Sequence, residues 1–457
     1  MPERKSDYVH VSDGTYVTGG GDELRMLFAT RTASAVAVPA PVAQALIDGR
    51  IGDIAPDVAE GLRQVEALVP ADEPELGTVL SRQRAAAKKT DRLTYVLLPT
   101  SYCNMGCGYC GQEHLRGRLT QDHRQAVVDR VLAGLAEPST QRVRVVWFGG
   151  EPMVGYAVIR SLSEKFVAEA ERLGKRYDAH IVTNGSLLNL EKVRVLHHEC
   201  RVRRFDITLD GPARIHDVHR PLKNGKKSFD HITSTLQEVL AADDLAGMQL
   251  VLRTNVDVQN IEWVDEYLDT IAGLGFATDR VFMNVAPVYS WGNDVSALEL
   301  ERAKFAAREI EWMRRMRDLG LRFDVVPRHV VGALCTAVTK SKEIISSTGN
   351  VFSCSEYPLL PEHEAGGGLG KVTSLPLMVR RPDGPFDDWH NAVESGETPC
   401  QKCRMYPICG GACPKQWREG NVPCPSYKYN MQERFDLIAE LNGLSPKPPV
   451  AVGASST

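Results

Sequence analysis

The sequence lacks the features that would attach the chain to a nucleic acid or to a membrane. Over 457 residues the formal net charge is −4, so there is no basic excess to neutralise phosphates or anionic lipids. No uninterrupted apolar run approaches the ~20 residues that a membrane-spanning helix needs. The polar start, MPERKSDYVHVSDG, has no apolar core of a signal peptide. We therefore expect a cytoplasmic protein with no nucleic-acid partner and no membrane span.

Cysteine is plentiful, and its distribution is uneven. Of the 11 cysteines, three stand in a C-x3-C-x2-C pattern at Cys103, Cys107 and Cys110, and seven lie between residues 335 and 424. A disulfide framework is not expected in a reducing compartment, so these groups indicate metal or catalytic sites. Cys200 stands alone, and we expect it to be a buried core thiol.

From residue 93 onward, apolar strands alternate with amphipathic helical patterns. The predicted strands are 94–99, 143–148, 179–183, 204–209, 249–254 and 280–286. The predicted helices are 120–136, 154–173, 188–199, 229–243 and 260–274, with further helix to about 318. Six such alternations predict an α/β fold with a parallel sheet.

Unusual residues follow the first four predicted strands, each at the point where the strand ends. They are the cysteine triplet, GGEP (149–152), NG (184–185) and DGP (210–212). In barrels built from such alternations, chemistry lies at the carboxyl ends of the strands. The sequence therefore predicts one site that is rimmed by successive loops.

The two ends of the chain differ from this central part. Residues 1–90 are predicted to form a small separate α+β domain, with a hairpin in ELRMLFATRTASAVAVP and two short helices that begin near prolines. Residues 81–92 form a polar, basic connector or helix. The tail 445–457 is rich in Pro, Ser and Ala and is predicted to be disordered.

The cysteine triplet is one ligand short of a closed metal site. Three thiolates can hold three irons of a [4Fe–4S] cluster and leave the fourth iron free to bind a small molecule. By spacing alone, a zinc site that uses His114 as an additional ligand is an alternative.

The order C-x3-C-x-aromatic-C, with GGEP after the next strand, resembles the radical S-adenosylmethionine (SAM) enzymes. The resemblance implies a partial (β/α)6 TIM barrel over 93–318, in which the amino and carboxylate groups of SAM bind the open iron. It further implies that Tyr109 packs near the adenine, and that Gly149, Gly150 and Glu151 meet the SAM amino group. Candidates for contacts with SAM or a nearby substrate are Thr208, Asp210, Arg220 and Asn255. His216 and Asp217 are expected to be structural.

The C-terminal cysteines, over residues 325–430, resemble the seven-cysteine motif of a SPASM domain. The resemblance implies two auxiliary [4Fe–4S] clusters, and so three clusters in the chain. The first would use Cys335, Cys354 and Cys413, and the second would use Cys400, Cys403, Cys409 and Cys424. A site for several zinc ions is the alternative. The first auxiliary cluster lacks a fourth thiolate, for which His329, Glu356, a substrate thiolate or no ligand remain open.

SPASM enzymes mostly modify peptides or proteins, so the resemblance implies a peptide-modifying oxidoreductase. A 5′-deoxyadenosyl radical would abstract hydrogen from a ribosomally made precursor peptide and lead to a cross-link or another side-chain or backbone modification. The reductant would be of the flavodoxin or ferredoxin type. Residues 1–90 resemble the peptide-recognition elements of such maturases, which bind a leader peptide as an added strand.

Two alternatives to a peptide maturase remain. The anaerobic sulfatase maturases, which make formylglycine, carry an Asp directly after the cysteine that matches Cys354. This chain has Ser355 and then Glu356, which is our candidate catalytic base. A non-catalytic iron–sulfur or zinc scaffold is the second alternative, although such a protein would have no use for GGEP or for an open three-cysteine cluster.

Overall fold

A computed structural model of the chain describes residues 2–114 and 117–447, and these residues group into two compact units. The first unit combines the described residues up to Arg84 with Asp324–Gly332 and with those from Trp389 onward. The second unit combines Ala85–Phe323 with Ala333–Asp388. Each unit is thus built from segments far apart in the sequence, and this division cuts across the predicted domain boundaries. No described helix is long and apolar enough to cross a bilayer.

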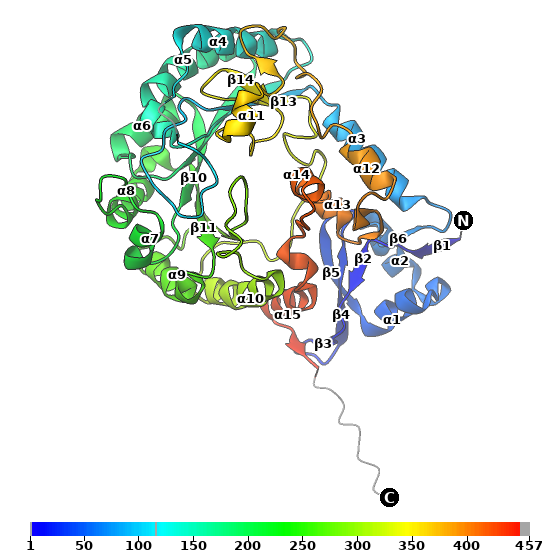
Figure 1. The fold of residues 1–457 in the computed structure, drawn as a ribbon. Coiled ribbons are helices and arrows are strands. Elements are labelled where there is room, and N and C mark those ends of the chain that lie inside the picture. Colours follow the sequence, from blue (N-terminus) through cyan, green and yellow to red (C-terminus); the bar gives the residue numbers. More distant parts are fainter. Residues whose placement is uncertain (1, 115–116, 448–457) are drawn as a thin grey trace, which may run out of the picture. The chain divides into compact units, whose positions relative to one another are not determined.

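The second unit contains a nine-stranded sheet whose centre is parallel. Six strands pair side by side in chain order: β7 (Arg92–Leu97), β8 (Arg142–Trp147), β9 (Arg176–Thr183), β10 (Val202–Thr208), β11 (Gln249–Val256) and β12 (Val281–Pro287). They correspond to the six predicted strands, and the predicted α/β class with a parallel core is confirmed. In Figure 1, helices α4 (Gln121–Ala136) to α10 (Arg302–Asp318) of this unit follow one another along the outer side of the strands.

Six helices of the second unit lie close to the predicted positions, and two shorter ones, α7 (Ala213–His219) and α11 (Pro361–Ala365), were not predicted. The six are α4 (Gln121–Ala136), α5 (Tyr156–Arg172), α6 (Leu190–His198), α8 (Phe229–Ala241), α9 (Val264–Gly273) and α10 (Arg302–Asp318), with short 3-10 turns η2 (Pro152–Gly155), η3 (Asp243–Leu245) and η4 (Ile261–Trp263). Thr120 and Asn189 cap α4 and α6, since each side chain accepts a backbone N–H of the first turn. Cys200 is a buried free thiol, as predicted.

Three short strands extend the sheet beyond β7. Strand β13 (Lys342–Ile345) pairs parallel with β7, and β14 (Asn350–Phe352) and β15 (Gly370–Lys371) follow with antiparallel pairing. The sequence pattern did not predict them, because runs of four, three and two residues are too short to show a periodicity. They place Cys354, which directly follows β14, in the same unit as the cysteine triplet.

The first unit contains the predicted hairpin within two small sheets. The strands are β1 (Glu3–Lys5), β2 (Val9–Val11), β3 (Tyr16–Val17), β4 (Glu23–Ala29), β5 (Ser34–Pro39), β6 (Leu68–Pro70) and β16 (Ser445–Pro446). Strand β4 pairs with β5 on one edge and with β2 and β3 on the other, and β1 pairs with β6. The tail that was predicted to be disordered over 445–457 therefore begins with a strand paired to β3, and residues 448–457 lie outside the described residues.

Short helices cover this part of the chain. They are α1 (Ala40–Asp48), α2 (Pro56–Gln64), α3 (Glu75–Ala87), α12 (Trp389–Glu394), α13 (Tyr406–Cys409), α14 (Pro414–Arg418) and α15 (Met431–Leu441), with 3-10 turns η1 (Ile51–Asp53), η5 (Pro399–Lys402) and η6 (Ser426–Lys428). Prolines stand in the first turns of α1 and α2, as predicted. Phe28 of β4 packs in one core with Met405 and Phe435, so the N-terminal and C-terminal segments share a hydrophobic core.

A buried ion pair joins the outer helix layer to the added strand β13. Arg130 of α4 donates from Nη2 to Glu343 Oε2 at 2.9 Å and from Nη1 to the carbonyl of Pro376 at 2.7 Å. Both charged side chains are almost fully buried. Burial of a single partner without the other would be strongly unfavourable.

We predict that Arg130→Met lowers the free energy of unfolding by about 3–5 kcal/mol, because it leaves the Glu343 carboxylate buried without a partner. Urea unfolding followed by circular dichroism measures the change. The matched control is Arg172→Met, since Arg172 and Glu169 form an exposed pair whose loss costs at most about 1 kcal/mol. Equal effects of the two substitutions would contradict the prediction.

Candidate active site and cysteine clusters

The cysteine triplet lies on the loop that follows the carboxyl end of β7. The sulfur of Cys103 accepts the backbone N–H of Met105 at 3.4 Å and lies 3.9 Å from Nδ2 of Asn184. The sulfur of Cys110 lies 3.8 Å from Nε2 of His114. Burial raises the pKa of Cys103 to about 11 and also raises that of Cys110. These thiols therefore need a cation to become thiolates, and the iron of a cluster would supply that charge.

The two glycines of GGEP let this turn lie directly on the cysteine loop. A Cβ atom on Gly150 would stand 2.7 Å from the carbonyl oxygen of Tyr102 and 2.8 Å from that of Ser101. Gly149 has a φ of +118°, which side-chain-bearing residues rarely adopt. The need for glycine is thus explained by contact between two loops of the chain itself, and the sequence argument had ascribed it to close approach of a ligand.

Glu151 is fully buried and connects the ends of β8 and β9. Its Oε1 accepts from the Thr183 hydroxyl at 2.6 Å and from the Met153 N–H at 2.9 Å. Its Oε2 accepts from the Asn184 N–H at 2.7 Å. Burial raises the pKa of Glu151, and these hydrogen bonds oppose the rise. The carboxylate of Glu151 is thus satisfied by donors of the chain itself, and its contact with the SAM amino group stays a prediction.

Four predicted residues from separate segments meet at the hydroxyl of Tyr109. This hydroxyl donates to Oδ2 of Asp210 at 2.6 Å and accepts from Nδ2 of Asn255 at 3.0 Å and from Nη1 of Arg220. Asp210 also accepts the backbone N–H of Asn255 through Oδ1 at 2.8 Å. The aromatic residue of the cysteine motif is thereby held at the carboxyl ends of β10 and β11.

Arg220 retains capacity for an anionic ligand. It is only 8 % exposed, and within the described chain its Nε has no hydrogen-bond partner. A buried N–H of a charged group that lacks a partner is unfavourable, so a ligand carboxylate would fit this position. Thr208, the last residue of β10, is also buried. These observations fit the predicted SAM site.

His219 belongs to this network, although sequence reasoning missed it. Its Nδ1 lies 3.2 Å from Oδ2 of Asp210 and its Nε2 lies 2.8 Å from Oδ2 of Asp257, while its ring packs 4.9 Å from that of Tyr109. Burial opposes the charged ring, but the two carboxylates raise the pKa of His219 to about 9. Burial likewise opposes the ionised Asp210, but Arg220 and His219 lower its pKa to about 2. The sequence feature that could have indicated His219 is its position directly before Arg220, in DVHRP.

The neighbouring residues His216 and Asp217 have structural contacts. His216 Nδ1 accepts the backbone N–H of Asp210 at 3.2 Å, and burial lowers its pKa to about 4. Oδ1 of Asp217 accepts the N–H groups of Ser228 and Phe229 at the start of α8. Both side chains therefore hold the DGP loop and the next helix in place.

Glu356, the candidate base, lies in the electrostatic neighbourhood of the cysteine triplet. Burial is the main cause of the raised pKa of Cys110, and the negative charge of Glu356 adds to it. The loop that carries Glu356 contacts the cysteine loop, since the Glu113 N–H donates to the carbonyl of Leu359 at 2.9 Å. The role of Glu356 as a base stays a prediction.

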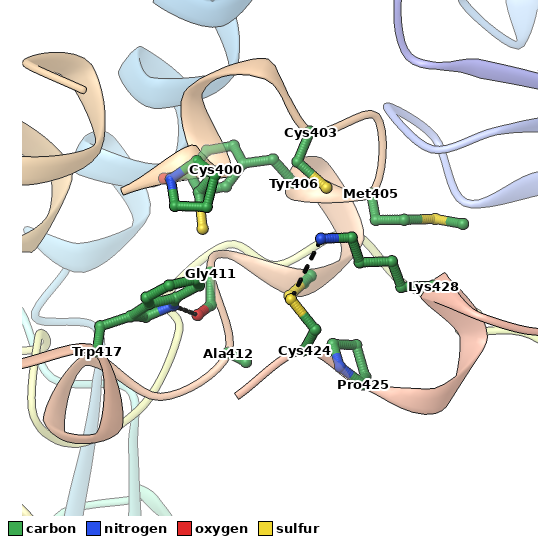
Figure 2. Close-up of a pocket in the computed structure, with 12 residues that line it drawn as sticks. Cys400, Cys403, Met405, Tyr406, Gly411, Ala412, Trp417, Cys424, Pro425 and Lys428 are labelled. Carbon is green, nitrogen blue, oxygen red and sulfur yellow. Dashed lines mark hydrogen bonds between the residues drawn. The ribbon is translucent and has the colours of Figure 1, made fainter. Parts of the chain in front are cut away.

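The four cysteines assigned to the second auxiliary cluster line one pocket of the first unit, together with Trp417, Lys428 and neighbouring residues. Figure 2 shows the thiols of Cys400, Cys403 and Cys424 turned toward the same space. Burial raises the pKa of Cys409 to about 12. Among residues 2–114 and 117–447, no three His, Cys, Asp or Glu side chains converge closely enough for a single metal ion.

The residues assigned to the first auxiliary cluster belong to both units. Cys335 and Cys354 lie in the second unit, whereas Cys413 immediately precedes α14 of the first. The candidate fourth ligands are divided in the same way, since His329 lies in the first unit and Glu356 in the second. The grouping of these residues around one cluster stays a prediction.

We predict that the contribution of His219 to stability depends on pH. Its pKa is raised from 6.5 to about 9, so the contribution is complete below pH 6.5 and is lost as the pH rises through 9. The difference in unfolding temperature between the native protein and His219→Gln should therefore shrink between about pH 6.5 and 10. The control, His198→Gln, alters an exposed histidine beside Asp244 and should cost at most about 1 kcal/mol. A pH-independent difference for His219→Gln would show that His219 is not charged in the folded protein.

Comparison with known proteins identifies the second unit. Residues 97–271 match the family model of the radical SAM superfamily. An uncharacterised protein of Synechocystis is 31% identical over 184 residues, which is 37% of this chain and 42% of that protein's length. The serine-type anaerobic sulfatase-maturating enzyme of Bacteroides thetaiotaomicron is 22% identical and matches 68% of this chain and 80% of its own length.

Two solved structures share the fold. Native anSMEcpe with bound AdoMet and the Cp18Cys peptide has a TM-score of 0.57 and 16% identity, over 77% of this chain and 97% of its own. Streptococcus suis SuiB bound to the precursor peptide SuiA has a TM-score of 0.50 and 14% identity, over 93% of this chain and 98% of its own. Residues 97–271 are therefore a radical SAM domain, which implies SAM and a [4Fe–4S] cluster as cofactors, and the chain is similar in sequence to the sulfatase-maturating enzymes.

Proposed function

We propose that this enzyme modifies a ribosomally made precursor peptide, on which it forms a cross-link or another side-chain or backbone modification. The observation that carries the proposal is the extent of the shared fold. The likeness to SuiB covers 93% of this chain, compared with 77% for the anSMEcpe structure. The likeness to a protein solved with a precursor peptide thus extends over a larger share of this chain, while the anSMEcpe structure has the higher TM-score.

The residues of the second unit would hold the cofactors as follows. Cys103, Cys107 and Cys110 would bind three irons, Arg220 would bind the SAM carboxylate through its free Nε, and Glu151 would accept from the SAM amino group. When bound, the cluster and SAM supply a 5′-deoxyadenosyl radical that abstracts hydrogen from an unactivated carbon. The network around Tyr109 would orient the cysteine loop and exclude water from it.

The first unit would recognise the leader of the peptide. Strand β5 pairs with β4 alone among the described strands, so its other edge is open to an added strand. Along β5 the side chains of Ala35 and Ala37 are exposed, and both are small. A peptide backbone could therefore approach this edge closely and pair with it.

The C-terminal cysteines would hold two auxiliary clusters, for three [4Fe–4S] clusters in all. Cys400, Cys403, Cys409 and Cys424 share one pocket, which supports the second of these sites. The first would use Cys335, Cys354 and Cys413. Electrons would come from a flavodoxin- or ferredoxin-type carrier in the cytoplasm, where such low-potential clusters and free thiols are kept reduced.

Formylglycine formation is a second candidate, and two observations favour it. The relatives from Bacteroides and Klebsiella are named serine-type sulfatase-maturating enzymes, with 22–23% identity. Glu356 lies close enough to Cys110 to influence it, so it could serve as the base in place of the Asp that those enzymes carry. In this case the product would be an aldehyde on a Ser or Cys residue of the target.

The first test is the production of 5′-deoxyadenosine. The protein, reconstituted anaerobically with iron and sulfide, is incubated with SAM, dithionite and each short peptide that an open reading frame next to the gene encodes. We expect nucleoside and a mass change in the peptide, whereas Cys107→Ala gives neither because the cluster loses a ligand. Cys200→Ala is the control, because this buried thiol lies outside the clusters. Unimpaired nucleoside formation by Cys107→Ala would refute the cluster assignment.

The same reaction separates the two candidate functions. A hydrazide probe labels an aldehyde, and a sulfatase-derived peptide with a target Ser or Cys replaces the precursor peptide in a parallel reaction. Aldehyde formation on that peptide, with no change in the precursor peptide, would favour formylglycine formation over the proposed function.

We predict that the precursor peptide slows amide hydrogen exchange in residues 34–39, because an added strand protects the open edge of β5. Mass spectrometry of proteolytic fragments measures this protection. Strand β1 serves as the internal control, since it pairs with β6 in a separate sheet. Binding of the peptide with unchanged exchange in β5 would contradict recognition at this edge.

A further inference from the structure

Lys428 contacts a sulfur of the second cysteine pocket. Its Nζ lies 3.4 Å from Sγ of Cys424, and Figure 2 shows the side chain turned back toward the cysteines. The turn η6 follows Pro425 and reverses the chain. Lys428, four residues after Cys424, therefore faces the sulfur of Cys424. Next to it, Tyr427 and Cys409 interact electrostatically, and burial is the main cause of the raised pKa of Cys409.

The position of Lys428 is not explained by an ordinary ion pair. Lys428 is an exposed residue, and in the described part of the chain it has no carboxylate partner. An exposed lysine can extend into water and keep its conformational freedom. Here the ammonium group instead lies against a thiol in a pocket lined by four cysteines.

We propose that Lys428 is a positioning residue that raises the reduction potential of the cluster held by Cys400, Cys403, Cys409 and Cys424. The inference rests on the proposed auxiliary cluster. Reduction adds one negative charge to an iron–sulfur cluster, and a nearby ammonium stabilises the reduced form more than the oxidised form. Hydrogen bonds to the sulfurs act in the same direction, and the Nζ of Lys428 lies 3.4 Å from Sγ of Cys424.

The test is a redox titration monitored by electron paramagnetic resonance. The full chain carries Cys103→Ala, Cys107→Ala and Cys110→Ala, so that only auxiliary clusters remain, and dithionite is the reductant. The signal of interest is the one that is lost in Cys400→Ala. We expect its midpoint potential to become more negative in Lys428→Gln and more negative still in Lys428→Glu. Lys428→Arg, which keeps the charge, should restore most of the native value.

Two further variants distinguish direct contact from general charge. Lys402→Gln removes the same charge from the same segment, but Lys402 does not line the pocket, so it should leave the potential nearly unchanged. Tyr427→Phe removes a hydroxyl donor without a change in charge and should lower the potential less than Lys428→Gln. The exposure of Lys428 means that its substitution should not alter the unfolding temperature.

The outcomes separate this inference from the proposed function. A cluster signal that depends on Cys400 but has the same potential in Lys428→Gln and in the native chain would overturn the role of Lys428 alone. An equal shift in Lys402→Gln would also overturn it, because the effect would then be one of net charge. Absence of iron and of any Cys400-dependent signal would overturn the auxiliary cluster itself, and the role of Lys428 with it.

Discussion

The carboxylate of Asp210 is the group on which the candidate active site depends. It is fully buried and receives the hydroxyl of Tyr109, the ring of His219 and the backbone N–H of Asn255. These donors come from the cysteine loop, from α7 and from β11, which are far apart in the sequence. A buried anion is stable only while its donors stay in place, so the carboxylate fixes the relative positions of these segments. At this carboxylate, the loop that carries the three thiols is held through its aromatic residue, Tyr109.

The charges around Asp210 are nearly balanced, and this balance limits what can bind. Asp210 and Asp257 are buried anions, and His219 and Arg220 are the cations beside them. Since the interior strengthens electrostatic interactions, an unpaired charge here would be costly. Among the described residues, Nε of Arg220 is a buried donor without a hydrogen-bond partner. An anionic group of a ligand would satisfy this donor, and a further anion without such a partner would be unfavourable.

Much of this could be predicted from the sequence, and the rest depends on contacts that no local pattern encodes. The six central strands are long enough for their apolar runs to be recognised, and the cysteines, GGEP and DGP mark the ends of these strands. His219 was missed because its role depends on Asp257, which is 38 residues away. The glycines of GGEP were singled out from the sequence, but a Cβ atom on Gly150 would meet residues 101–102, and one on Gly149 would meet Leu98 and Thr100. The sequence did not predict that both ends of the chain belong to one compact unit. They do so because Phe28 and Phe435, far apart in the sequence, pack in a shared core.

The cysteine triplet and the pocket with four cysteines differ in the side chains around their sulfur atoms, and this difference suits different roles. At the triplet, three thiols stand beside polar side chains with unused hydrogen-bonding capacity, so a small polar molecule can complete the site. At the second pocket, four thiols are enclosed by side chains such as Tyr406 and Trp417, and the polar groups near the sulfurs are donors. A site without a vacant position cannot bind a substrate through iron, but its charge state can respond to the donors around it. With clusters bound as proposed, the same ligand type would support chemistry at the first site and storage of an electron at the second, because the surroundings of the sulfur atoms differ.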